Sequence, residues 1–346
     1  MTRYLIPRGI LSGPAADRAI AAGLAVPLAG GPLAFTLAEG IERQAGEEGQ
    51  RRPLDLAAAR GFAAPQFDAL MRARAPWAGF DLARPLIMGV LNVTPDSFSD
   101  GGDFADAAAA IARGRAMLDA GADIVDVGGE STRPGAAPVA PQEEAARVLP
   151  VVRALAEAGA IVSIDTRHAS VMDQAVSAGA RIINDVTALT GDADSPRVAA
   201  RSGAAIVLMH MLGEPQTMQA DPRYADVTCD LLDYFDARLV ALDRLGVDRA
   251  RIAVDPGIGF GKTVEHNMQL IDELAAFHGF GCAVLLGASR KSFIGRLSRG
   301  EAPKQRLAGT LAAHQMGWER GAQIVRVHDV AEAAQARAIW LAACCR

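Results

Sequence analysis

From residue 85 onward, short apolar runs alternate with longer segments whose apolar residues recur at helical spacing. The runs are rich in Val, Ile and Leu, which is typical of strands that are buried on both faces. The predicted strands are LIMGVL (86–91), DIVDV (123–127), IVSID (161–165), RIIND (181–185), AAIVLMH (204–210), RIAVD (251–255), AVLLG (283–287) and AQIVRV (322–327). The predicted helices between them include 105–120, 142–158, 225–245 and 303–320.

Strands that alternate with helices in this way predict an α/β protein with a parallel sheet. Eight strand–helix units between residues 85 and 346 fit a (β/α)8 TIM barrel, and a doubly wound open sheet is the alternative. We therefore predict a barrel domain at 85–346, preceded by a small N-terminal extension, 1–84, of unknown role.

The extension lacks this periodicity, although residues 65–74 favour a short helix. Its uncharged stretch 19–38 follows several arginines and imitates a targeting signal. Prolines and glycines interrupt that stretch, so we interpret it as short strands and turns. Every motif with chemical potential comes later in the chain, and we expect the chemistry to lie in the barrel.

A polar residue ends or follows each predicted strand. A barrel of this type works at the carboxyl ends of its strands, where these side chains meet. Helix caps and turns explain some of them, but hardly one at all eight positions. The polar positions are Asn92, 128–133, Asp165, Asn184, His210, Asp255, Ser289 with Lys291, and Arg326 with His328.

Overall charge excludes two classes of partner. The net charge is −5 and the pI is about 5.7, which argues against a nucleic-acid surface or a polybasic membrane face. Any anion site must therefore be local.

The cysteines, Cys229, Cys282, Cys344 and Cys345, show no metal-binding spacing, and a reducing cytoplasm is the simplest setting.

Two polar, glycine-ended loops leave the first two strands, NVTPDSFSDGG (92–102) and GGESTRPG (128–135). With SIDTR (163–167), RIINDV (181–186), DPGIGFGKT (255–263), GASRKSFIG (287–295) and IVRVHDV (324–330), they closely resemble the dihydropteroate synthase family. The resemblance runs through residues 85–342, in order and without a missing motif.

The resemblance implies an enzyme of folate biosynthesis, the target of sulfonamides, which acts as a homodimer and uses Mg²⁺. In this reaction p-aminobenzoate attacks the methylene of 6-hydroxymethyl-7,8-dihydropterin pyrophosphate, giving 7,8-dihydropteroate and pyrophosphate. By position, the pterin residues are Asp165, Asn184, Asp255 and Lys291. The pyrophosphate residues are Asn92, Arg326 and His328, of which Asn92 also binds the metal. The p-aminobenzoate residues are Thr132, Arg133, Pro134, Phe260 and Ser292. The implied catalytic set is Asn92, Asp100, Lys291, Arg326 and His328.

Residue chemistry suits these roles independently. A buried carboxylate at Asp255 can accept paired N–H donors from the guanidine-like edge of a pterin. Arg326 and His328 share one face of their strand, so both can donate to phosphate oxygens. Some of these residues have alternative interpretations: Asp165 and Asp255 as framework ion pairs, Lys291 as a Schiff-base nucleophile, and Asn92 as a turn residue.

An aromatic amine is a weak nucleophile, whereas pyrophosphate leaves readily once its charge is compensated. This favours an SN1-like path through a bound pterin cation. Phe98 and Asp100 on the first loop, with 132–134 on the second, would then close over the cation, unless both are ordinary surface loops.

Other functions remain to be weighed. The segment 256–263 resembles a phosphate-binding loop, but Pro256 stands where that motif needs glycine. His210 lacks a second metal ligand at a useful spacing and is better explained as a core or rim residue. The rivals are a pterin-binding methyltransferase on the same barrel, which would not need Arg326 and His328 for pyrophosphate, and a catalytically idle paralogue.

Overall fold

The computed structural model describes residues 1–94, 103–130, 139–213 and 217–344. Within them, eight parallel strands close into a barrel in chain order, and the last pairs with the first. The TIM-barrel prediction is confirmed, and an open sheet with two free edges is excluded. The strands are β5 (Leu86–Asn92), β6 (Ile124–Gly128), β7 (Val162–Asp165), β8 (Ile182–Asp185), β9 (Ala205–Met209), β10 (Ile252–Asp255), β11 (Ala283–Leu286) and β12 (Ile324–Val327).

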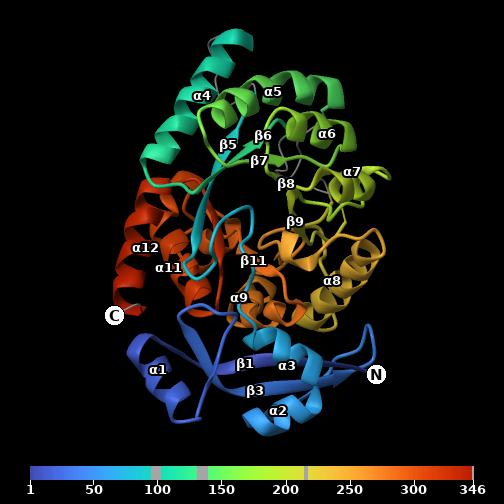
Figure 1. Ribbon diagram of the computed structural model, residues 1–346, viewed down its shortest axis with the longest axis vertical. Coiled ribbons are helices and arrows are strands. Elements are labelled where there is room, and N and C mark those ends of the chain that lie inside the picture. The colour runs from blue at the N-terminus through green and yellow to red at the C-terminus, as the bar shows by residue number, and fades with distance from the viewer. Residues whose placement is uncertain (95–102, 131–138, 214–216, 345–346) are drawn as a thin grey trace.

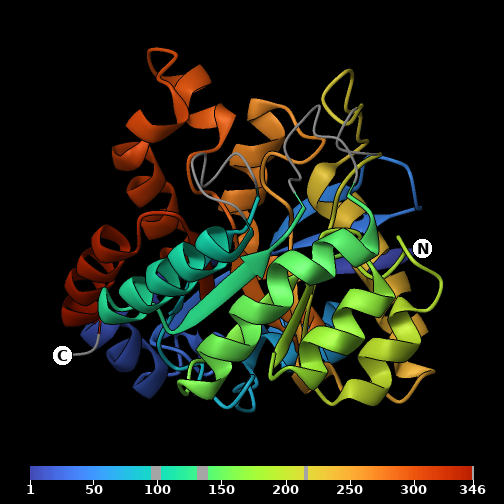
Figure 2. The same cartoon turned by 90° about the horizontal axis from the view of Figure 1, so that it is seen from above.

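Helices surround the strands, and α4 to α7 form the near wall in Figure 2. None of the helices in the described ranges is long and apolar enough to cross a membrane. The α-helices are α4 (Asp103–Asp119), α5 (Pro141–Glu157), α6 (Ala169–Ser177), α7 (Ser195–Ser202), α8 (Val227–Asp243), α9 (Val264–Asp272), α10 (Ser292–Leu297), α11 (Leu307–Glu319) and α12 (Val330–Cys344). Short 3₁₀ turns are η2 (Arg249–Arg251), η3 (Leu274–Phe280) and η4 (Pro303–Gln305).

Alternation along the strands separates two apolar clusters. Residues such as Ile87 and Val125 point outward and pack under the helices, whereas Met88 and Ile124 point into the barrel. Further along β6 the inward position after Ile124 is Asp126, so the interior changes from apolar to polar toward the carboxyl ends of the strands. The fold therefore builds an apolar floor beneath a polar mouth.

The extension forms a four-stranded antiparallel sheet at one end of the molecule, drawn in blue in Figure 1. Helix α3, which lies within the predicted helix 65–74 apart from its first residue, packs against η3 of the barrel, and α2 packs on β3. The sequence did not predict the two long strands, β1 and β3. The elements are β1 (Thr2–Ser12), α1 (Gly13–Ala21), β2 (Val26–Pro27), β3 (Leu33–Arg43), β4 (Gln50–Leu54), α2 (Leu56–Phe62) and α3 (Ala64–Met71).

The segment that leads from the extension into the barrel closes the barrel's amino-terminal end. Trp77 is 1% exposed and packs with Leu82 against the inward apolar residues of the strands. Its indole Nε1 donates to the carbonyl of Arg251 at 3.0 Å, which satisfies the one polar atom of the ring. The link is therefore a plug that completes the apolar core.

Ion pairs dock the extension on α8 and α9. Arg51 of β4 donates to Glu273 at 2.6 Å and to Asp226 at 2.5 Å. Both carboxylates have side chains that are only 5% exposed. Burial would raise the pKa of Asp226, but hydrogen bonds from Arg51 and from the backbone of Cys229 outweigh it and lower that pKa. Arg8 reaches Glu273 as well, at 3.0 Å.

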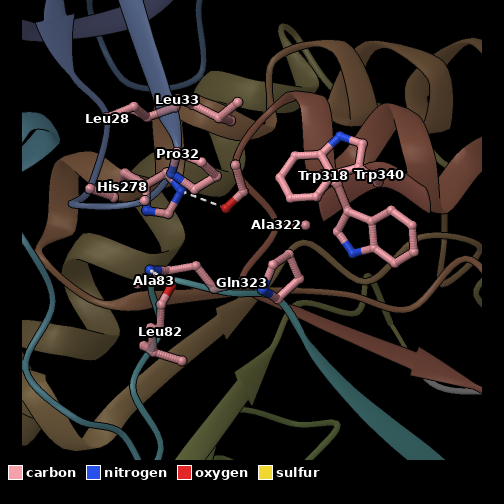
Figure 3. A pocket seen from close by; sticks show the side chains of 14 residues that line it. Leu28, Pro32, Leu33, Leu82, Ala83, His278, Trp318, Ala322, Gln323 and Trp340 are labelled. Atoms are coloured by element: carbon pink, nitrogen blue, oxygen red, sulfur yellow. Dashed lines mark hydrogen bonds between the residues drawn. The ribbon is translucent and has the colours of Figure 1, made fainter. Parts of the chain in front are cut away.

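A small cavity lies at the junction of extension and barrel, where Leu28 and Pro32 face Trp318 and Trp340 (Figure 3). His278 beside it donates from Nε2 to the carbonyl of Gly321 at 2.9 Å. Burial and the charge of Arg74 lower the pKa of His278 to about 3, so the ring is neutral. The extension is thus held by buried contacts and is not a loose appendage.

We expect Arg51→Met to lower the free energy of unfolding by about 1.5 to 3 kcal/mol, because it removes charge-assisted hydrogen bonds from two nearly buried carboxylates. Chemical denaturation measures this. Arg3→Met is the matched control, since Arg3 and Glu42 form an ion pair whose side chains are 51% and 32% exposed. That change should cost less than about 1 kcal/mol. Equal effects of the two variants would contradict a docking role for Arg51.

Candidate active site

The polar mouth is assembled by strand register. Asp165 of β7 pairs with Asn184 of β8 on one side and with Gly128 of β6 on the other. Asp255 of β10 pairs with Met209 of β9. Because the strands are parallel, their carboxyl ends lie at one rim, and the predicted pterin residues of the strands share it.

Arg326 of β12 lies at the centre of this rim. Its Nε donates to Oδ2 of Asp126 and its Nη2 to Oδ2 of Asp165, each at 2.6 Å. Asn184 donates from Nδ2 to the same oxygen of Asp126 at 3.0 Å. Four strands are thereby joined by one network of side chains. Oδ1 of Asp126 is buried and has no hydrogen-bond partner within the described ranges.

Electrostatics of this cluster follow from two carboxylates and one cation. Burial alone would lower the pKa of Arg326, but Asp126 and Asp165 outweigh it and raise that pKa above its ordinary value. The pKa of Asp165 is raised, because burial and the nearby charge of Asp126 outweigh the attraction of Arg326. Asp165 is therefore harder to ionise than an aspartate in water.

Asp255 and Lys291 form a second group at the mouth. Asp255 is 5% exposed, and its Oδ1 accepts from the backbone N–H of Gly257 at 2.7 Å. Burial raises its pKa to about 6. Lys291 has its Nζ 3.8 Å from the ring centroid of Phe260, and burial together with the charge of Arg326 lowers its pKa to about 8. The mouth therefore holds a carboxylate that can accept hydrogen bonds and an ammonium group that can donate them.

A strained turn aims Lys291 inward. Arg290 has φ +58, a left-handed conformation that side chains other than glycine rarely adopt. Its backbone N–H donates to Oγ1 of Thr310 at 3.0 Å, its carbonyl accepts from Arg306 at 3.0 Å, and its side chain pairs with Asp329. Holding such a conformation costs about 1 to 3 kcal/mol, which these contacts offset.

His328 is oriented by Ser289. Its backbone N–H donates to Oγ of Ser289 at 3.1 Å, and its Nδ1 lies 2.9 Å from the same oxygen. The hydroxyl has one proton, which it can donate to Nδ1, leaving Nε2 protonated and available as a donor. Burial and the charges of Arg326 and Arg290 lower the pKa of His328 to about 3, so the ring is neutral.

Of the remaining predicted residues, three lie within the described ranges and four do not. Phe260 is 9% exposed and packs with Val186, Met209 and Met218 in an apolar cluster at the mouth. Ser292 is exposed at the first position of α10, and Asn92 is half-buried at the end of β5. Asp100 and the loop residues Thr132, Arg133 and Pro134 lie outside the described residues.

Sequence reasoning missed Asp126. It lies inside the predicted strand 123–127, whereas the predicted polar positions all end or follow a strand. A signal was present, because the two-residue period places Asp126 on the inward face with Ile124, and a carboxylate inside a barrel needs a partner. Lys262, which is buried beside His210, was likewise noted only as part of a rejected motif.

Comparisons with known proteins show which family this chain belongs to. The sequence pattern of the family described as "Pterin binding enzyme" matches residues 88–328. The dihydropteroate synthase of Escherichia coli (strain K12) is 44% identical over 267 residues, covering 77% of this chain and 94% of that protein. The dihydropteroate synthase of Bacillus subtilis (strain 168) is 45% identical over 254 residues, covering 73% and 86%.

Solved structures of dihydropteroate synthases are also similar to this chain. The Yersinia pestis dihydropteroate synthase in complex with a sulfonamide drug has a TM-score of 0.72 and 44% identity, covering 76% of this chain and 96% of that chain. The Xanthomonas albilineans enzyme with 4-aminobenzoic acid has a TM-score of 0.73 and 43% identity, covering 78% and 97%. The class defined by fold and site is that of the pterin-binding barrels. Within it, this chain belongs to the dihydropteroate synthase family.

We expect pterin affinity to depend on the protonation of Asp255. Only the ionised carboxylate accepts two N–H donors, so affinity should be constant above the pKa of about 6 and fall below it, by about tenfold per pH unit. Calorimetric titration of a bare pterin between pH 5 and 7.5 measures this. Asp255→Asn should weaken binding by about 1 to 3 kcal/mol and flatten the profile.

Asp173→Asn serves as the control, because it changes a carboxylate that is 53% exposed on α6. Its pH profile should match that of the unmodified protein. A slope that persists in Asp255→Asn would assign the titration to Asp165, and an affinity that is constant from pH 5 to 7.5 in the unmodified protein would contradict the prediction.

Proposed function

We propose that this protein condenses 6-hydroxymethyl-7,8-dihydropterin pyrophosphate with p-aminobenzoate, giving 7,8-dihydropteroate and pyrophosphate. The observation that carries the proposal is the single rim that holds Asp165, Asn184, Asp255, Lys291 and Arg326 together. Xanthomonas albilineans dihydropteroate synthase, of similar sequence and fold, has been solved with 4-aminobenzoic acid and with 7,8-dihydropteroate.

In the pterin half of the site, Asp255 accepts the paired N–H donors of the ring edge, and Asn184 donates and accepts beside it. Lys291 hydrogen-bonds the ring carbonyl or N5. Asp255 is nearly buried, so these hydrogen bonds form away from water, where they are stronger. Ring orientation is thus set before chemistry begins.

In the leaving-group half, Arg326 and His328 donate to pyrophosphate oxygens. The reaction then follows an SN1-like path in which the bond from the methylene to oxygen breaks first and positive charge spreads over the pterin. Asp126 lies beside Arg326, so its negative charge favours that cation. The amine of p-aminobenzoate attacks the cation and afterwards loses a proton.

Mg²⁺ belongs to this proposal as a partner of pyrophosphate. The described residues contain no group of three or more His, Cys, Asp or Glu side chains that could hold a metal. The side-chain oxygen of Asn92 is a hard donor of the kind that Mg²⁺ prefers, whereas Oδ2 of Asp165 near the same strand end already accepts from Arg326. When bound, the metal supplies charge compensation for the leaving group. A homodimer and a cytoplasmic location remain predictions.

The test of function is direct. Purified protein with the pterin pyrophosphate and radiolabelled p-aminobenzoate should form labelled dihydropteroate and an equal amount of pyrophosphate. Asp255→Asn serves as the weakened variant. Methyl transfer from a folate to a corrinoid, without condensation, would establish the rival methyltransferase. A folded protein that binds pterin and has neither activity would be the idle paralogue.

We expect Arg326→Lys to lower turnover by about 10²-fold, by analogy with the loss of one preorganised donor to a developing anion. Lysine keeps the charge that Asp126 needs, whereas alanine would leave that buried carboxylate without its cation. Affinity for a pterin without pyrophosphate should change less than about threefold.

The double variant Arg326→Lys/His328→Ala checks whether the two donors serve one group. Because both act on the same leaving group, its effect should deviate from the product of the single effects. If instead both variants weaken bare and pyrophosphorylated pterin equally and the melting temperature falls sharply, the end of β12 is part of the framework.

A further inference from the structure

The sequence contains only three lysines, and two of them lie at the mouth of the barrel. They are Lys262, Lys291 and Lys304, in a chain with 35 lysines and arginines together. Lys304 is exposed, whereas Lys262 is 2% exposed, although it has no carboxylate partner within hydrogen-bonding distance in the described part of the chain. A buried ammonium group is costly, so its contacts show what it is retained for.

Lys262 has one acceptor for each of its three N–H groups. Its Nζ lies 2.9 Å from the carbonyl of Phe260, 3.0 Å from Nδ1 of His210 and 3.4 Å from the carbonyl of His210. Three donors on a compact ammonium match this arrangement, and the planar fork of arginine would not. Burial and the charge of Lys262 lower the pKa of His210 to about 2, so its Nδ1 is free to accept.

These contacts fix the loop that follows β10. Gly257 and Gly261 have φ of +68 and +63, and a Cβ at Gly257 would lie 2.0 Å from the carbonyl oxygen of His210. The loop therefore passes against the end of β9 without room for a side chain. Lys262 binds both sides of that contact, because it donates to the His210 carbonyl and to a carbonyl of the loop.

Neighbouring side chains hold the same loop. Tyr224 donates to the carbonyl of Gly261 at 2.8 Å, and Gln219 donates to the carbonyl of Gly259 at 2.6 Å. The ring of Tyr234 meets that of His210 edge-on, with centroids 4.8 Å apart. Among these anchors only Lys262 binds the carbonyl of Phe260, the residue whose ring lies under Lys291.

We infer that Lys262, together with His210, is a positioning residue that holds Phe260 in place for p-aminobenzoate. The inference deepens the proposed function and rests on it, because Phe260 is assigned to p-aminobenzoate. Asp255, the carboxylate assigned to the pterin, has its own anchor, because it accepts from the N–H of Gly257. Loss of Lys262 should therefore affect one substrate more than the other.

The test is Lys262→Met, which keeps the length of the side chain and removes every donor. KM for p-aminobenzoate should rise by about ten- to a hundredfold, as for loss of a hydrogen bond to a charged group. The dissociation constant of a bare pterin should change less than about threefold. Lys262→Gln, which can still donate to one carbonyl, should give a smaller rise and is the variant to use if methionine prevents folding.

A double-mutant cycle shows whether Lys262 acts through Phe260. In the background of Phe260→Leu, adding Lys262→Met should raise KM no further. Lys304→Met is the matched control for loss of a lysine and should behave like the unmodified protein. Equal weakening of both ligands, or additive effects in the cycle, would overturn the inference and make Lys262 part of the general framework. Failure of the function itself would appear earlier, as an unmodified protein without condensation activity.

Discussion

The mouth of this barrel depends on one ion-paired guanidinium. Arg326 lies between Asp126 and Asp165, and Asn184 completes the network. Asp126 is fully buried, and removing its cation would leave an uncompensated charge that costs about 3 to 5 kcal/mol. The same group therefore stabilises the fold across four strands and sets the charge of the site. Arg326 therefore contributes both to the stability of the barrel and to the chemistry proposed for the site.

The sequence predicts the barrel well because its signal is local. Eight apolar runs and the helices between them are each visible within a short window, and the strand register then follows from closing the barrel. The extension is different. Thr2 pairs with Arg43 and Glu42 with Gln50, and Tyr4, Leu5 and Ile6 are buried in succession, so the two-residue alternation of a half-buried strand is hidden. Long-range pairing of this kind leaves little local trace.

The candidate site likewise has parts that the sequence predicts and parts that it does not. Asp165, Asn184 and Asp255 could be predicted because each ends a strand at a common rim. The inward aim of Lys291 could not, since it depends on a left-handed turn at Arg290 that Thr310, Arg306 and Asp329 hold from distant parts of the chain. The inward position of Asp126 follows from alternation alone, but Asp126 lies within its strand and not at the strand's end.

Charge at the mouth also bears on the metal. Within the described residues, Asp126 and Asp165 share one cation, Arg326, whereas Asp255 lies near Lys262 and Lys291, and burial keeps His328 neutral. Burial raises the pKa of Asp165 and of Asp255. This arrangement disfavours a pyrophosphate, because one guanidinium that already serves two carboxylates cannot compensate several phosphate charges. Further positive charge must arrive with the substrate or from outside this network. The Mg²⁺ proposed at Asn92 would satisfy that requirement together with the phosphate oxygens, without adding a permanent positive charge beside the pterin.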